Sequence, residues 1–242
     1  MTTLGLLVCG TFSDKIMRKY DGLYEDFFIQ GLSAQKASLS FQTYRVFEND
    51  FPDSVDACDA WLITGSVSGV YEDLPWITRL LAFARDAYEK KIPLVGICFG
   101  HQLIAQALGG KVIKSPKGWG LGFQRYELQD NMIGIESDFL DLYAIHQDQV
   151  VEVPPVATVF ARSEHCPAAA LRYEGRALSF QAHPEFSREF ETDLIESLLG
   201  EKLDVATGRA AIDSMQSTDV HNAQVMQTIG DFITGENLCE CD

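Results

Sequence analysis

A cysteine flanked by glycines is the residue of this sequence best placed to act as a nucleophile. The segment Gly96-Ile97-Cys98-Phe99-Gly100 lies between an apolar run that predicts a strand and a run that predicts a helix. This is the nucleophile-elbow pattern with cysteine in place of serine. Glycines permit the sharp turn, and the positive end of the following helix favours thiolate over thiol. A small buried cysteine in a tight turn explains this segment equally well.

A cysteine nucleophile needs a base that is held by an orienting group, and one histidine has such a partner nearby. On an extended segment, His183 and Glu185 point to the same side, so the carboxylate can hold one ring nitrogen. Pro184 biases His183 toward extended geometry. Alone, the pair is a surface turn; together with the cysteine elbow it predicts a base and its orienter. We interpret His101, three residues after Cys98, as structural or as supporting the site from behind.

Acyl transfer also needs hydrogen-bond donors that face the tetrahedral oxyanion. The amide of Phe99, directly after the cysteine, is one natural donor. The loop Thr64-Gly65-Ser66-Val67-Ser68-Gly69 follows a predicted strand and offers a second. Open α/β sheets place their sites at the carboxyl ends of such strands. The chain has no G-x-x-x-x-G-K-[ST] phosphate loop, so we expect no nucleotide module of that kind.

The amino-acid composition and net charge make some classes of binding partner unfavourable. The chain of 242 residues has 19 basic and 35 acidic residues, a net charge of −16, and its pI is near 4.6. Nucleic acids and anionic membrane surfaces are therefore unfavourable partners. Six cysteines without a CxxC pair predict neither a disulfide scaffold nor a zinc site, and a reducing, cytoplasmic setting is expected. We expect no metal and no cofactor, and interpret the Cys239–Cys241 CxC as part of a loose end.

Alternating strand and helix signals must position these groups. The first half predicts buried strands over 4–9, 40–46, 60–64 and 93–97, with helices between and after them. Asp73 is the expected cap of the helix that begins with Pro75. The second half predicts hairpins over 109–128, strands over 143–153, 158–161, 168–173 and 177–181, and helices over 186–198 and 220–233.

This order predicts an α/β fold: an open, mostly parallel central sheet with helices on both faces and a small antiparallel β extension. The expected organisation is a single domain over residues 1–242. Its C-terminal helix and tail occupy about 204–242, an acidic stretch that we interpret as a solvated outer helix followed by a loose end.

Two motifs together resemble a known family. Gly-Ile-Cys-Phe-Gly-His-Gln, which contains Cys98, and the segment Gln181–Glu185 are similar to the motifs of the class I, triad-type glutamine amidotransferases, which have a flavodoxin-like sheet. The likeness covers about residues 1–200 and includes Ile145-His146-Gln147-Asp148 between the two motifs. It implies hydrolysis of a γ-glutamyl amide, of glutamine or another γ-glutamyl compound, through a γ-glutamyl thioester.

The resemblance also implies roles for single residues. Cys98 is the nucleophile, His183 the general base and acid, and Glu185 its orienter. Backbone amides of Gly65 and Phe99 supply the oxyanion donors. The glutamine head group meets the following residues: Gln102, His146, Gln147 and Asp148.

The chain departs from the biosynthetic members of that family in ways that bear on function. Thr64-Gly65-Ser66 stands where those members usually carry Gly-Gly-Pro, and Phe99 replaces the more usual leucine or tyrosine. With no fused synthetase domain, the chain is similar to a free-standing branch that includes γ-glutamyl peptidases; a separate synthetase subunit remains a possible partner. The alternative is a non-enzymatic binding or redox-sensing protein that uses an exposed Cys98 thiolate. The intact His183–Glu185 pair favours the enzyme, because a sensor needs no oriented base.

Overall fold

The computed structural model describes residues 1–20, 22–174, 176–216 and 219–236. Its strands are β1 (Thr2–Val8), β2 (Leu39–Arg45), β3 (Ala60–Ile63), β4 (Leu94–Ile97), β5 (Lys111–Lys114), β6 (Gly120–Leu128), β7 (Phe139–His146), β8 (Asp148–Glu152), β9 (Ala157–Arg162), β10 (Ala170–Tyr173) and β11 (Ala177–Phe180). Its α-helices are α1 (Asp14–Tyr20), α2 (Tyr24–Gln35), α3 (Pro75–Glu89), α4 (Phe99–Ala107), α5 (Arg188–Leu198), α6 (Val205–Ser214) and α7 (Asn222–Thr234).

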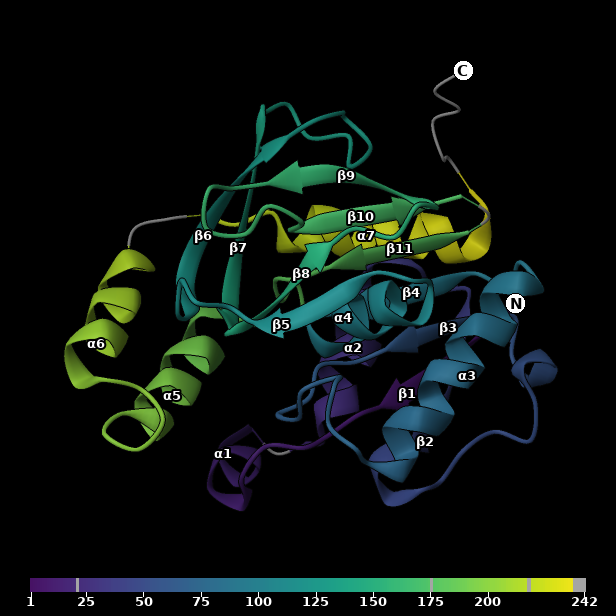
Figure 1. The fold of residues 1–242 in the computed structure, drawn as a ribbon, viewed down its shortest axis with the longest axis horizontal. Helices are drawn as coiled ribbons and strands as arrows, with labels where there is room; N and C mark the ends of the chain where they lie inside the picture. Colours follow the sequence, from purple (N-terminus) through teal and green to yellow (C-terminus); the bar gives the residue numbers. More distant parts are fainter. Residues whose placement is uncertain (21, 175, 217–218, 237–242) are drawn as a thin grey trace.

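One large sheet runs through the molecule in the order β2-β1-β3-β4-β11-β10-β9-β6-β7 (Figure 1). Neighbours from β2 to β11 pair in parallel, and those from β11 to β7 pair antiparallel. A separate two-stranded ribbon joins β5 to β8. The predicted fold class is confirmed, and the antiparallel strands continue the parallel sheet instead of forming a separate layer.

Helices cover both faces of the parallel part because its strands are apolar on both sides. Leu4 and Leu6 of β1 belong to the core cluster that contains residues of α2 and α7. Leu7, the residue after Leu6, points to the opposite face and packs with residues of α3 and α4. A third, smaller cluster holds α5 and α6 against β6 and β7.

The structure differs from the sequence expectations at four places. The strand predicted over 143–153 breaks at Gln147, because β7 pairs with β6 in the large sheet whereas β8 pairs with β5 in the ribbon. Leu74, not Asp73, caps α3, and no side-chain hydrogen bond closes that end. The described residues of 204–236 contain two helices, α6 and α7, of which only the second was predicted from the sequence. Helix α1 was not predicted.

Not one of the helices in the described ranges is both long enough and apolar enough to cross a lipid bilayer. Cys239 and Cys241 lie outside the described residues.

Candidate active site

Cys98 occupies a strained turn between β4 and α4. Its backbone has φ 52° and ψ −101°, a region that residues with a side chain rarely adopt. The turn is held from behind, where the Cys98 amide donates to the Phe180 carbonyl of β11 at 2.8 Å. The side chain stands at the N-terminal end of α4, where the helix dipole favours a thiolate.

The two flanking glycines are required by close backbone approach. A Cβ on Gly96 would lie 2.5 Å from the carbonyl carbon and oxygen of Gly100. A Cβ on Gly100 would lie 2.2 Å from the Ile63 carbonyl oxygen of β3. Helix α4 therefore begins in direct contact with the neighbouring strand, and this contact sets where the Cys98 sulfur is presented.

His183 and Glu185 form a buried pair beyond the end of β11. The Nδ1 atom of His183 lies 2.7 Å from Oε1 of Glu185. An antiparallel bridge to Tyr143 of β7 anchors His183, whose amide donates to the Tyr143 carbonyl at 2.9 Å. The chain turns at Pro184–Glu185 instead of staying extended as the sequence analysis expected, and the two side chains meet within that turn.

The His183 ring is further held by stacking on Phe186, with ring centroids 4.2 Å apart and planes 6° from parallel. Burial alone lowers the pKa of His183, but the charges of Glu185 and Cys98, with hydrogen bonds to both, raise it well above its ordinary value. The arrangement therefore favours the protonated imidazolium form of His183 beside Glu185 and Cys98.

Tyr24, at the start of α2, links this pair to the loop after β3. Its hydroxyl donates to Glu185 Oε1 at 3.0 Å and accepts from the Gly65 amide at 3.2 Å. The side chain is buried and packs edge-on against Phe12. Tyr24 was not predicted from the sequence, since an aromatic residue at a helix start carries no signal of its distant partners.

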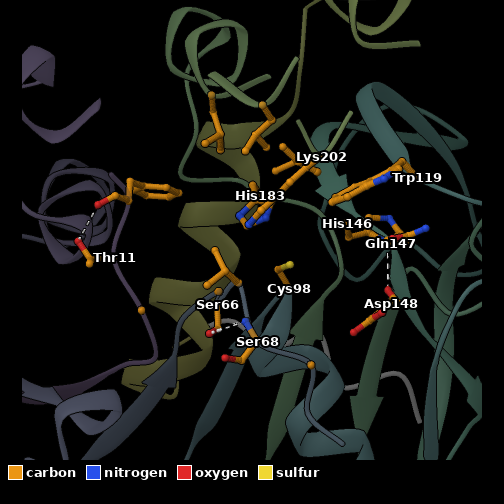
Figure 2. Close-up of a pocket in the computed structure, with 18 of the residues that line it drawn as sticks. Thr11, Ser66, Ser68, Cys98, Trp119, His146, Gln147, Asp148, His183 and Lys202 are labelled. Atoms are coloured by element: carbon orange, nitrogen blue, oxygen red, sulfur yellow. Dashed lines mark hydrogen bonds between the residues drawn. The ribbon is translucent and has the colours of Figure 1, made fainter. Parts of the chain in front are cut away.

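These groups share one pocket of about 460 Å³. Figure 2 shows Cys98 below His183, with His146, Gln147 and Asp148 on one side and Thr11 on the other. A Cβ on Gly65 would lie 3.2 Å from His183 Cε1 and 3.7 Å from Cys98 Cβ, so the loop after β3 closes on both side chains.

The residues at the β7–β8 junction line one wall of the pocket. Asp148 accepts a hydrogen bond from Tyr71 at 3.1 Å, and burial raises the pKa of its carboxyl. Burial lowers the pKa of His146 to about 3, so this ring is neutral; its Nδ1 lies 3.2 Å from the Asp148 carbonyl oxygen. Gln102 donates to that same carbonyl at 3.0 Å and to Gln181 at 3.1 Å. The junction and α4 are thus tied together, and Gln147 completes this wall.

The two predicted oxyanion donors differ in their hydrogen bonding. The Phe99 amide belongs to the first turn of α4 and has no intrahelical acceptor. The Gly65 amide already donates to Tyr24. Ser66 follows it in the pocket lining, and its amide has no acceptor within the described part of the chain. Both loop amides are thus near Cys98, and the Ser66 amide is the one that does not already donate a hydrogen bond.

The remaining histidines and cysteines of the described residues lie away from this centre, or burial shifts their pKa so that they stay neutral. His101 is fully buried against Ser179, and burial lowers its pKa to about 3. Burial raises the thiol pKa of Cys9 and Cys58, and raises that of Cys166 to about 12.

Comparison with known proteins agrees with this geometry. The family model for class-I glutamine amidotransferases matches residues 25–199. The chain is 35% identical over 173 residues to a glutamine amidotransferase-like protein of Schizosaccharomyces pombe, covering 67% of this chain and 68% of that protein. It is 27% identical over 206 residues to gamma-glutamyl peptidase 5 of Arabidopsis thaliana, covering 81% of each.

Among solved structures, a glutamine amidotransferase from Methylobacillus flagellatus superposes with a TM-score of 0.72 at 23% identity, over 98% of this chain and 95% of that one. This likeness shows a shared fold. The match of the family model over most of the chain shows more: the chain belongs to the class I glutamine amidotransferase family.

Proposed function

We propose that the protein is a cysteine-dependent γ-glutamyl hydrolase in which Cys98, His183 and Glu185 form the catalytic triad. The observation that carries the proposal is the strained Cys98 at the α4 N-terminus, in one pocket with a His183–Glu185 pair 2.7 Å apart. A redox sensor has no use for an oriented, buried base beside its thiolate.

The reaction follows from these positions. The Cys98 sulfur attacks the γ-carbonyl carbon of the substrate and forms a carbon–sulfur bond. His183 gives its proton to the leaving nitrogen as the carbon–nitrogen bond breaks, which leaves a γ-glutamyl thioester. A water molecule then loses a proton to His183 and attacks the thioester carbon. The carbon–sulfur bond breaks, glutamate leaves, and the triad returns to its first state.

Backbone amides stabilise the charge that develops on the γ-carbonyl oxygen. Phe99 supplies one, and the Gly65–Ser66 loop supplies the second. If Gly65 is that donor, its amide must leave Tyr24 during the reaction, whereas Ser66 can donate without losing a bond. Each such donor contributes about 3–4 kcal/mol to lowering the barrier.

We assign the two ends of the substrate to opposite walls of the pocket. Asp148, with Gln102, His146 and Gln147 around it, forms the polar wall that we assign to the glutamyl head group. The opposite side holds apolar residues of the α1 segment and α5, among them Phe12 and Leu198, with Lys202 at the rim. This room beyond the scissile bond supports a leaving group larger than ammonia, as in the relatives named γ-glutamyl peptidases.

The test is to incubate the purified chain, without ATP or a partner, with glutamine and with γ-glutamyl dipeptides, scoring ammonia, glutamate and released amino acids. We expect dipeptides to be hydrolysed faster than glutamine, and Cys98→Ala to abolish both reactions. Activity that appears only after a synthetase-like protein is added contradicts the free-standing hydrolase and returns the chain to an amidotransferase subunit. Turnover retained in Cys98→Ala contradicts the nucleophile.

A further inference from the structure

Glu191 is a fully buried carboxyl group that interacts electrostatically with His183 and Glu185 of the proposed triad. It lies in the first turns of α5, where its amide donates to the Ser187 carbonyl at 3.0 Å. Its exposed fraction is 0%, and among the acidic residues described the Glu185 side chain is equally buried. Neither of its carboxyl oxygens has a hydrogen-bond partner in the described part of the chain.

Other buried polar atoms of this region also lack a hydrogen-bond partner among the residues that the structure describes. Glu185 uses Oε1 to bind both His183 and Tyr24, while its second oxygen, Oε2, has no donor. The Tyr126 hydroxyl of β6 is likewise buried without a partner, and it interacts electrostatically with Glu191. Such unpaired groups are costly in an apolar interior, so donors and acceptors in this region must balance.

This balance of donors and acceptors depends on whether Glu191 carries a proton. Of the unpartnered atoms in these three residues, the carboxyl oxygens are acceptors and the Tyr126 hydroxyl can donate, so an ionised Glu191 would add a second buried anion to that of Glu185 without adding a donor. A protonated Glu191 adds an O–H donor and no charge. Burial raises the pKa of Glu191 to about 8, while the charge of His183 lowers it and that of Glu185 raises it. Near neutral pH the protonated acid therefore predominates.

The groups that face Glu191 come from three elements. His183 and Glu185 follow β11, Tyr126 belongs to β6, and the apolar rings of Phe186 and Phe190 surround the start of α5. Cys98 and Cys166 interact with Tyr126 from the same side. Among the described residues that shift the pKa of Glu191, His183 is the single group that favours its ionisation, and the effect of burial outweighs it.

We propose that Glu191 is a positioning residue that acts as a neutral carboxylic acid, leaving Glu185 as the single negative charge that holds His183. This inference rests on the triad of the proposed function. His183 must give up its proton to the leaving nitrogen and later take one from water. A second carboxylate behind the pair would hold the imidazolium too firmly for either step, so ionisation of Glu191 slows turnover.

The first experiment compares pH profiles of kcat/KM for γ-glutamyl hydrolysis in the wild type and in Glu191→Gln. The amide keeps the shape of the side chain but cannot ionise. We expect the wild type to lose activity as the pH rises through about 8 and the variant to lose several-fold less. Glu189→Gln, which removes an exposed carboxylate from the same helix, is the matched control and should keep the wild-type profile. If kcat/KM falls equally at high pH in the wild type and in Glu191→Gln, the proposal is overturned.

The second experiment needs no substrate, so it separates failure of this inference from failure of the proposed function. NMR of protein carrying ¹³C-labelled glutamate should show one carboxyl carbon that titrates near pH 8. With labelled histidine, His183 should titrate at a higher pH in the wild type than in Glu191→Gln. If every glutamate titrates near its ordinary pKa, the neutral acid does not exist and the proposal fails. The glutamate titration uses the wild type alone, so it decides the question even if the variant does not fold.

Discussion

At the scale of single residues, the site depends on charges that are paired inside the protein. Glu185 faces His183 at 2.7 Å and binds Tyr24 through the same oxygen. The pair is buried, so its electrostatic interaction is screened little by water or salt. Changes that alter one charge without altering shape therefore test its role most directly.

Glu185→Gln should leave the fold intact and reduce hydrolysis by roughly 10³-fold or more. The amide still reaches His183, but it does not stabilise the imidazolium and can hold the wrong tautomer. His183→Ala should be at least as severe. Steady-state rates, with circular dichroism to verify folding, provide the measurement, and wild-type turnover in a folded variant would rule out the triad.

Glu191 should also leave a signature in stability. Its folded-state pKa of about 8 exceeds the ordinary 4.5, so the folded protein binds this proton more tightly than the unfolded chain. The contribution of Glu191 to the free energy of unfolding is therefore fully present below about pH 4.5 and is lost as the pH rises toward 8. At roughly 1.4 kcal/mol per pKa unit, the loss approaches about 5 kcal/mol.

The measurement is urea unfolding of the wild type, Glu191→Gln and the control Glu189→Gln from pH 5 to 8. The stability of Glu191→Gln relative to the wild type should grow with pH, while that of Glu189→Gln should not. A constant difference across this range would show that Glu191 ionises as freely in the folded protein as in the unfolded one.

At the scale of elements, the contact of β4 and α4 with β3 positions the Cys98 side chain in the pocket. The strain at Cys98 persists because Gly96 and Gly100 let backbone pass directly against backbone. The nearest atoms that a new methyl group would meet are main-chain atoms, which have no rotamer to change.

Gly100→Ala should therefore destabilise the protein by about 3 kcal/mol and reduce Cys98 alkylation, because α4 must move away from the Ile63 carbonyl. Gly10→Ala is the control, since a Cβ there would meet Ser66 at an ordinary 3.5 Å. Chemical denaturation and timed alkylation with mass mapping provide the two readouts. Equal stability of the two variants would show that the elbow is not tightly packed.

At the scale of the whole molecule, the pocket joins segments from residue 10 to residue 202. The loops after β1 and β3, the elbow after β4, the β7–β8 junction and the turn after β11 all meet there. We infer that residues 1–242 act as a single domain, because the parallel and antiparallel parts of the sheet each contribute walls to the same pocket.

The net charge of −16 belongs to this scale too. Repulsion among surface carboxylates opposes the compact state, and added salt screens it within about 10 Å at 0.1 M. We expect the melting temperature to rise by about 2–4 °C between low and physiological ionic strength, which corresponds to roughly 1 kcal/mol. Differential scanning calorimetry in a NaCl series measures it, and a falling melting temperature would show that ion pairs outweigh the repulsion.

The sequence by itself determined what is local. Glycines near Cys98 on both sides, the two-residue spacing from His183 to Glu185, and alternating apolar runs are short-range patterns, and they were enough to predict the fold class and to propose the triad. Only the tertiary structure decided what depends on long-range pairing. Tyr24 meets Glu185 across 161 positions of the chain, β7 and β8 separate at Gln147 because they pair in different sheets, and Glu191 becomes a buried acid only where α5 packs behind His183. No residue's own neighbours in sequence carry that information, because burial and distant hydrogen bonds arise only when the sheet assembles.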